Sequence, residues 1–229
     1  MSKNIIVSGA SGGLGKDVVN KLAGGENNLY VTFGSKKVDT FQDLENVTSQ
    51  VVDLTDQDAA MNFVNATIEK AGTIQAGIFL AGGYAPGNLH ATDDALLEKM
   101  FNINFFTAFH LVKPLMKHFE TTGGGQFIFI GARPALEADQ GKGNFAYALS
   151  KSLVFKMAEF INSEGKSKNI TATVIVPSTI DTPMNREAMP DADFSKWVSG
   201  TDIAENIAFV LSESGAKLRE TVLKVYNNG

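Results

Sequence analysis

Tyr147 and Lys151 have the side-chain types and the spacing needed to move a proton. Residues four apart on a helix lie on the same face, so the phenol and the ammonium group are expected to be neighbours. A neighbouring positive charge stabilises the phenolate, and we expect it to lower the pKa of Tyr147 from about 10 toward neutrality. Such a phenol can donate or accept the proton that accompanies hydride transfer. An incidental pair is the alternative, so the placement of the two residues in the chain must decide.

A second motif lies near the amino terminus, where an apolar, β-branched run at residues 4–8 leads into a glycine-rich stretch. The stretch reads Ser8, Gly9, Ala10, Ser11, Gly12, Gly13, Leu14 and Gly15. In a turn from a strand to a helix, glycines let backbone N–H groups approach a pyrophosphate, which the electropositive helix end also attracts. The hydroxyls of Ser8 and Ser11 are candidates for further hydrogen bonds to the turn or to phosphate. We predict nucleotide binding; a tight turn that merely contains glycine is the alternative.

Short apolar runs alternate with longer helix-like segments along the whole chain. Strands are predicted at residues 4–8, 29–33, 49–52, 76–80, 126–131, 171–176 and 221–226, and helices near residues 14–24, 56–71, 93–120, 145–164 and 201–213. Several of these strands are apolar at successive positions, as strands buried on both faces are. The pattern predicts an α/β fold, with a doubly wound, Rossmann-type sheet of seven mostly parallel strands and helices on both faces.

Length and composition limit the organisation of the chain and its chemistry. A length of 229 residues without a long linker rich in Pro, Gly or Ser favours one domain. We therefore expect residues 1–229 to form a single nucleotide-binding domain that carries both the cofactor and the substrate site. The chain has no cysteine, which excludes disulfide scaffolds, thiolate metal sites and cysteine nucleophiles. Its histidines at positions 90, 110 and 118 lack the spacing of metal ligands, so no metal site is expected.

The charge balance disfavours polyanionic partners. The formal net charge is −5, and the basic residues cluster only at Lys36 and Lys37, so we expect neither nucleic acid nor an anionic membrane as a partner. No apolar run approaches the roughly 20 residues that cross a bilayer, and the amino terminus is too short for the apolar core of a signal peptide. We expect a soluble, cytoplasmic protein that acts on a small molecule.

Together the two motifs resemble those of a known family. The glycine-rich stretch fits the T-G-x-x-x-G-x-G fingerprint of the short-chain dehydrogenase/reductase family, with Ser8 in place of Thr. Tyr147 and Lys151 form that family's Y-x-x-x-K signature, and Asn104 resembles its structural and proton-relay asparagine. The resemblance spans the whole chain. It implies a nicotinamide-dependent oxidoreductase in which Tyr147, Lys151 and Asn104 are the catalytic residues.

The resemblance also implies a set of cofactor contacts. These residues are Gly9, Ser11, Gly13, Leu14 and Gly15 in the glycine turn, Asp53 and Leu54 at the adenine, Ala81 and Gly82 after the fourth strand, Pro177 and Thr182 beside the nicotinamide, and Tyr147 with Lys151. The chain departs from the family at two of these places. Phe79 and Leu80 replace the two asparagines that usually precede Ala-Gly, and Ser178 replaces a glycine.

A further departure concerns the residue that normally assists reduction of a carbonyl group. Ala132 stands where the family carries a serine on the exit of the fifth strand. The dihydropteridine reductase branch of the family lacks the same serine, and residues 81–88, 131–136 and 181–197 resemble that branch. The resemblance implies reduction of a quinonoid dihydropteridine to a tetrahydropteridine, with Tyr147 as the proton donor. The residues expected around the substrate are Tyr84, Ala132, Met184 and Trp197.

The end of the second strand bears on the choice of nicotinamide. The 2′-hydroxyl of NAD favours a carboxylate there, whereas the 2′-phosphate of NADP is repelled by one. Ser35, Lys36 and Lys37 follow the strand at residues 29–33, and no acidic residue occurs before Asp39. A small hydroxyl with adjacent ammonium groups suits a phosphate, so we expect NADPH, with contacts from Ser35 and Lys36. A solvated loop with two lysines is the alternative, which leaves NADH open.

Two other functions and two assembly states stay open at this point. The same scaffold serves generic carbonyl or quinone reductases, and the lost serine and asparagines also fit a non-catalytic NADP-binding sensor. The segment 95–119 is apolar on more than one face, which is typical of a helix that packs on the sheet and on another subunit. We expect this segment and the helix of Tyr147 to pair across a two-fold axis, giving a homodimer or a homotetramer. A wide core stripe alone is the alternative.

Overall fold

The computed structural model describes residues 2–34 and 39–227 of the chain. Within them, a seven-stranded sheet has the order β3-β2-β1-β4-β5-β6-β9, and every neighbouring pair is parallel. The strands are β1 Asn4–Ser8, β2 Asn28–Phe33, β3 Val47–Val51, β4 Ala76–Phe79, β5 Gly125–Ile130, β6 Ile170–Pro177 and β9 Val222–Val225. Parallel neighbours require crossover connections, which the helices between the strands provide. The predicted doubly wound α/β fold is confirmed.

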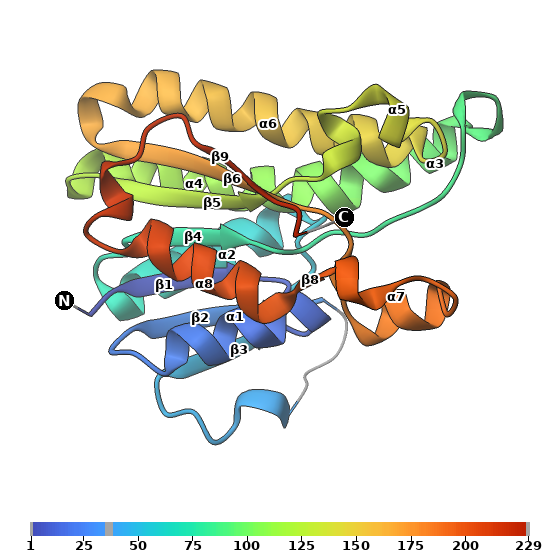
Figure 1. Cartoon of the computed structure of the whole chain (residues 1–229). Coiled ribbons are helices and arrows are strands. Elements are labelled where there is room, and N and C mark those ends of the chain that lie inside the picture. Colours follow the sequence, from blue (N-terminus) through green and yellow to red (C-terminus); the bar gives the residue numbers. More distant parts are fainter. Residues whose placement is uncertain (1, 35–38, 228–229) are drawn as a thin grey trace.

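Helices cover both faces of the sheet (Figure 1). One face carries α1 Gly13–Ala23 and α8 Gly200–Leu211, and the other carries α2 Gln57–Ala71, α4 Thr107–Thr122 and α6 Phe145–Gly165. None of the helices within the described ranges has both the length and the apolar content that a bilayer crossing requires.

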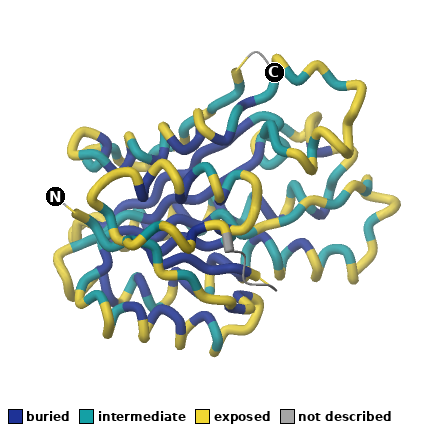
Figure 2. The backbone as a smooth tube through the Cα atoms, turned by 90° about the horizontal axis from the view of Figure 1, so that it is seen from below, coloured by how far each residue is buried: buried dark blue, intermediate teal, exposed yellow. Residues whose placement is uncertain are grey.

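The core is divided between the two faces by the pleat of the strands. On β1, Ile5 and Val7 pack toward α1 and α8, whereas Ile6 packs toward the layer of α2, α4 and α6. This alternation follows from the two-residue period of a strand, and it explains why β1 is apolar at successive positions. Figure 2 shows the outcome, with buried strands inside and exposed residues along the outer sides of the helices.

The strand order reverses at β1, which pairs with β2 on one side and with β4 on the other. In open α/β sheets, ligands bind at such a switch point, outside the carboxyl ends of the strands. The glycine-rich stretch follows β1 at this place. Two short elements, α5 Ala138–Gly141 and α7 Pro183–Ala188, lie at the same edge (Figure 1).

The elements differ from the sequence expectations in two places. The helix expected near residues 93–120 is divided into α3 Asp94–Phe101, a π-helical turn Asn102–Phe106 and α4. A π turn keeps the helix going, so the apolar pattern gives no sign of it, and such turns are frequent at functional sites. The sequence indicates no strand in the segment between residues 177 and 200. The segment contains a two-stranded sheet of β7 Ile180–Asp181 and β8 Val198–Ser199, too short to produce a periodic signal.

Candidate active site

The turn between β1 and α1 has a backbone shape that only glycine allows. Gly9 has φ +71°, and a Cβ there would lie 2.6 Å from the backbone N of Ala81 at the end of β4. A Cβ on Gly15 would lie 2.3 Å from the carbonyl O of Gly9. Both positions therefore exclude a side chain. At Gly9 the dihedral angle and the contact with Ala81 exclude it, and at Gly15 the contact with the Gly9 carbonyl does.

The first turn of α1 offers backbone donors to a ligand. Gly12 caps the helix without a side-chain hydrogen bond, and the N–H groups of Gly13, Leu14 and Gly15 donate to no acceptor among the described residues. Ser11 and Gly12 are exposed beside them. Unpaired N–H groups at a helix amino end, held close by glycines, fit the pyrophosphate of a dinucleotide.

Ser8 has a structural role between two strands, whereas Thr182 lies beside the glycine-rich turn. The buried hydroxyl oxygen of Ser8 accepts hydrogen bonds from the N–H groups of Leu80 and Ala81, at 3.2 and 3.3 Å, so it joins the ends of β1 and β4. The side chain of Thr182 lies against Gly13, where a Cβ would be 2.9 Å from its Cγ2. The structure thus brings together two expected cofactor residues that are far apart in the sequence.

The residues expected at the adenine follow β3. The exposed carboxylate of Asp53 accepts hydrogen bonds from the N–H and the hydroxyl of Thr55, at 2.9 and 2.6 Å, and these bonds hold its pKa below the usual value. Leu54 is buried, and its carbonyl accepts a 2.9 Å hydrogen bond from Nδ1 of His110 on α4. The expected contacts at Ser35 and Lys36 lie outside the described residues.

Lys151 lies in the interior, on α6. Its Nζ donates a 3.0 Å hydrogen bond to the carbonyl of Ile130, the last residue of β5, and burial lowers the pKa of the ammonium group to about 8. A Cβ on Gly82 would lie 3.4 Å from this Nζ and 2.7 Å from Oδ1 of Asn104. Gly82, Asn104 and Lys151 therefore meet at one place, as the sequence predicts.

Tyr147 lies one turn before Lys151 on α6, and its ring packs edge-on against Tyr84, with ring centroids 5.2 Å apart. The expectation of a lowered pKa is wrong for this structure. Burial, and to a smaller extent the neighbouring Tyr84 phenol, raise the pKa of Tyr147 to about 12. Loss of water around the phenolate is the larger cause, and the ammonium group of Lys151 donates its hydrogen bond to the carbonyl of Ile130.

Asn104 is buried in the π-helical turn and holds the loop after β4. Its Oδ1 accepts from the N–H of Gly83 at 2.9 Å, and its Nδ2 donates to the carbonyl of Gly83 at 3.0 Å and to Oγ of Ser150 at 3.1 Å. The Ser150 hydroxyl in turn donates to the carbonyl of Tyr147 at 2.7 Å. Ser150 was not predicted as a site residue. The sequence offers only its position, one residue before Lys151, as a signal, and the structure adds that the residue is fully buried.

Ala132 is buried two residues after the end of β5, where no hydroxyl is present to assist Tyr147. The next residue, Arg133, pairs with Glu137 at 3.0 Å and lies over the ring of Tyr226, 4.9 Å from its centroid. The expected serine site is thus apolar, as the sequence indicates.

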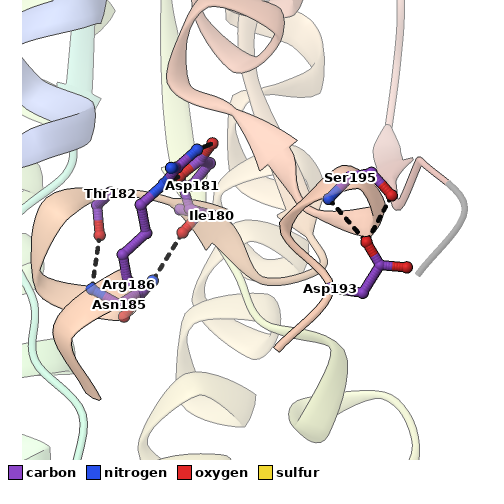
Figure 3. A network of polar contacts seen from close by, with 7 residues as sticks. All are labelled: Ile180, Asp181, Thr182, Asn185, Arg186, Asp193 and Ser195. Atoms are coloured by element: carbon purple, nitrogen blue, oxygen red, sulfur yellow. Dashed lines mark hydrogen bonds and ion pairs between the residues drawn. The ribbon is translucent and has the colours of Figure 1, made fainter. Parts of the chain in front are cut away.

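A separate segment approaches the glycine turn from the end of β6. Pro177 is buried as the last residue of β6, and Thr182 caps α7 by accepting from the N–H of Asn185 at 3.2 Å (Figure 3). Met184 on α7 is 78% exposed. Trp197 is half-buried and packs on Phe194, with centroids 4.7 Å apart, rather than on Tyr84 or Tyr147. Among the four expected substrate residues, all of which lie in the described part of the chain, only Tyr84 forms an aromatic contact with the Tyr147 ring.

Metal ions have no evident place in this site. In the part of the chain that the structure describes, no group of three or more His, Asp or Glu side chains is arranged to hold a metal ion. The groups described above that could take part in chemistry or binding are the phenol of Tyr147, the ammonium of Lys151 and the backbone donors of α1.

Comparison with known proteins agrees with this geometry. Residues 3–193 match the family model described as short chain dehydrogenase. The chain is 30% identical to a dihydropteridine reductase of Dictyostelium discoideum over 220 residues, which cover 90% of this chain and 87% of that protein. It is 28% identical to a 3-oxoacyl-(acyl-carrier-protein) reductase of Mycobacterium bovis over 235 residues, with coverage of 98% and 92%.

One of the similar solved structures contains a bound cofactor. A blue fluorescent protein from a metagenomic library, solved in complex with NADPH, superposes with a TM-score of 0.88 at 25% identity, covering 99% of this chain and 97% of that one. The glycine turn, the Tyr147–Lys151 pair and these likenesses lead to one conclusion. The chain is an NAD(P)-dependent oxidoreductase of the short-chain dehydrogenase/reductase family.

Proposed function

We propose that the chain is an NADPH-dependent reductase that converts a quinonoid dihydropteridine to a tetrahydropteridine. The observation that carries it is the pairing of the Tyr147 ring with the exposed ring of Tyr84, one helical turn before the buried Lys151, while the buried Ala132 stands where the family carries a serine. A second hydroxyl donor serves the reduction of a carbonyl oxygen, whereas an electron-poor quinonoid ring needs only a hydride and a proton. Similarity to the relative named dihydropteridine reductase supports the substrate class.

Tyr147 acts in this proposal as the proton donor. A pKa of about 12 keeps its phenol protonated at neutral pH, which is the state that a donor must have before reduction. When bound, the reduced nicotinamide supplies the hydride. The hydride and the proton from Tyr147 together add two electrons and two protons to the ring, which gives the tetrahydropteridine. Tyr147 is left as a phenolate, and water reprotonates it.

Lys151 and Asn104 prepare the site for that transfer. The buried ammonium of Lys151 stabilises the phenolate that forms at Tyr147, and we assign it a contact with the nicotinamide ribose. Asn104 fixes the loop at Gly83 and, through Ser150, the helical turn that carries Tyr147. Its side-chain atoms are engaged in these bonds, so we assign it a positioning role and leave the relay of protons to other groups.

The cofactor proposal combines the sequence with the structure. The N–H groups of Gly13, Leu14 and Gly15 would hold the pyrophosphate, and Asp53 and Leu54 would border the adenine. The choice of NADPH over NADH is supported by the absence of an acidic residue from position 34 to position 38. The similar structure solved with NADPH also supports it.

The substrate proposal centres on Tyr84. Its ring is 62% exposed, and its edge-on contact with Tyr147 places a flat apolar surface next to the proton donor. Aromatic rings stack readily on flat heterocycles, so Tyr84 suits a pteridine. We assign Met184 and Trp197, on the segment after β6, to the far side of the same substrate.

Oxidation of the reduced nicotinamide tests the function directly. NADPH and NADH are each followed by absorbance with a quinonoid dihydropterin, a simple ketone, a 3-oxoacyl thioester and a quinone. We expect NADPH oxidation with the dihydropterin to exceed that with every other substrate. Faster turnover of a ketone or a quinone would identify a generic reductase, and nucleotide binding without any turnover would identify a sensor.

We also propose that the protein forms a homodimer. Large apolar side chains remain exposed on the helices expected to pair, namely Phe106, Phe109, Leu149 and Phe160. Exposed apolar groups that gather on neighbouring helices are typical of subunit interfaces. Light scattering at micromolar concentration tests this proposal, and a monomeric mass would contradict it.

A further inference from the structure

The segment from residue 180 to residue 199, here called the flap, connects β6 to α8 across the glycine turn. Thr182 at its beginning lies against Gly13, and Trp197 lies near its end. The bounds of the flap are joined by the short pairing of β7 with β8. Val198, the residue after Trp197, is buried in the core, and its N–H donates a 2.9 Å hydrogen bond to the carbonyl of Thr179, so the backbone is held on that side of Trp197. The residues on the other side of Trp197 depend on further contacts.

Contacts of side chains within the flap give it part of its shape. The guanidinium of Arg186 forms two hydrogen bonds with the carboxylate of Asp181, at 2.6 and 2.8 Å (Figure 3). It also lies 4.6 Å from the centroid of the Phe194 ring. Asp193 accepts hydrogen bonds from the N–H and the hydroxyl of Ser195, at 3.2 and 2.6 Å, which form a tight turn (Figure 3). These contacts give the flap an internal shape, but they do not attach Trp197 to the sheet.

A side-chain attachment of the backbone at Ser195 and Trp197 comes from the segment after β9. Asn227 follows β9, and its Nδ2 donates to the carbonyls of Ser195 and Trp197, at 3.1 and 3.0 Å. Both hydrogens of one amide are thus used on the flap. The residue before it is tied to the sheet, because the carbonyl of Tyr226 accepts a 2.8 Å hydrogen bond from the hydroxyl of Ser178. Asn227 therefore links the flap to the sheet through the end of β9.

The backbone of Asn227 restricts which residue can serve here. Its φ is +51°, in the left-handed region that asparagine tolerates better than other residues with a side chain. An amide supplies two N–H donors from one nitrogen, whereas an aspartate of the same shape supplies acceptors only and would repel the two carbonyls. Asparagine meets both requirements at once.

We propose that Asn227 is a positioning residue that fixes Trp197 at the substrate side of the active site. It acts on the substrate through Trp197 and does not touch the reacting atoms. The inference rests on the proposed function for its kinetic consequence, since Trp197 is there assigned to the substrate. The link between Asn227 and Trp197 itself rests only on the hydrogen bonds.

Trp197 provides its own reporter, because it is the only tryptophan in the chain. We compare the wild-type protein with Asn227→Asp, which removes both donors while keeping the size of the side chain. Asn206→Asp is the matched control, since Asn206 makes a single 2.8 Å hydrogen bond to the carbonyl of Asp202 on α8. Acrylamide quenching of Trp197 fluorescence and steady-state kinetics with NADPH and quinonoid dihydropterin are measured for all three.

We expect Asn227→Asp to increase the quenching constant of Trp197 about twofold and to raise the KM for the dihydropterin about fivefold, with a smaller change in kcat. Asn206→Asp is expected to change neither. Unchanged quenching in Asn227→Asp would overturn the link. Increased quenching with an unchanged KM would overturn the placement of Trp197 at the substrate.

Two controls keep the result decisive. Should Asn227→Asp fail to fold, Asn227→Gly carries the same test, because glycine adopts the positive φ without strain and has no amide. Should the wild-type protein not reduce the dihydropterin, the proposed function fails, and the quenching measurement still decides whether Asn227 holds Trp197.

Discussion

The glycine turn and the flap meet at Gly13 and Thr182, but they are built from different interactions. The glycine turn is defined by its backbone, through the positive φ of Gly9 and the contact of Gly15 with the Gly9 carbonyl. The flap is defined by exposed side chains: Asp181 with Arg186, Asp193 with Ser195, and Asn227 with the carbonyls of the flap. Close-packed backbone cannot adjust to a substitution, whereas solvated side-chain contacts can be exchanged one at a time.

This difference separates the two tasks of the site. The cofactor is the same for every reaction of such an enzyme, so its cradle can be rigid. The substrate differs between relatives whose names include a dihydropteridine reductase and a 3-oxoacyl-(acyl-carrier-protein) reductase. We infer that selectivity for the substrate resides in the flap and can change without disturbing the glycine turn. The following predictions test the separation, beginning with the proton donor that lies outside both regions.

Tyr147→Phe should have the largest effect on turnover. The substitution removes the proton donor and leaves the backbone of both regions unchanged, so kcat should fall on the order of 10²-fold or more. The affinity for NADPH, measured by fluorescence titration, should stay within about twofold of the wild-type value. Wild-type rates in this variant would remove Tyr147 from its proposed role.

Lys151→Met should lower turnover less than Tyr147→Phe does, and yet stabilise the fold. Burial lowers the pKa of Lys151 to about 8, below its unfolded value of about 10.5, so the folded protein pays for a buried ammonium group at neutral pH. An apolar side chain of similar length removes that cost, which is of the order of 3 kcal/mol at most. Denaturant unfolding at pH 7 measures the gain.

The pH dependence of that gain follows from the direction of the shift. Below pH 8 both states carry the charge, and the wild-type protein bears the full penalty. Between pH 8 and about 10.5 the unfolded chain binds more protons than the folded one, so the stability of the wild-type protein rises with pH. The difference between wild type and Lys151→Met should therefore be largest below pH 8 and shrink toward pH 10. A constant difference would mean that Lys151 is not the group responsible.

Much of the glycine turn, and the strands beside it, could be predicted from the sequence. The glycine spacing located the turn, and the apolar runs located all seven strands of the sheet to within about two residues. Both features are local: strand runs reflect burial on two faces, and Gly9 reflects a backbone angle. The glycine turn can therefore be recognised from the sequence alone, without knowledge that Ala81 lies next to it in the fold.

The side-chain contacts could not be predicted in the same way. The raised pKa of Tyr147 depends on burial and on Tyr84, which the fold brings next to it from another loop. The bonds from Asn227 to the flap join chain segments with no shared pattern. Such contacts follow from the assembled fold rather than from the periodicity of any one element, which is why the direction of the Tyr147 pKa was wrongly predicted.

Gly9→Ala should show how rigid the glycine turn is. The new methyl group meets the backbone N of Ala81 at 2.6 Å in a backbone with φ +71°, so we expect a loss of about 2–3 kcal/mol in the free energy of unfolding and much weaker binding of NADPH. Gly143→Ala is the matched control, because a Cβ there would meet nothing within 4 Å. Equal stability of the two variants in urea unfolding would contradict the proposed rigidity.

Arg186→Gln should have the smallest effect, because it acts on the adjustable flap. The guanidinium is exposed and its partner Asp181 is partly exposed, so water and salt screen their attraction, and the melting temperature should hardly change. Loss of the contact with Phe194 should nevertheless loosen the neighbouring Trp197, raising its acrylamide quenching and increasing the KM for the dihydropterin about two- to threefold, with the affinity for NADPH preserved. Since salt also weakens the ion pair in the wild-type protein, the difference in quenching between wild type and Arg186→Gln should narrow as NaCl is raised.

Arg219→Gln is the control, because Arg219 donates to the carbonyls of Ala216 and Leu218 and lies outside the flap. If Arg186→Gln weakened NADPH binding as strongly as Gly9→Ala, the flap and the glycine turn would form one unit, and selectivity for the substrate could not change independently of the cofactor.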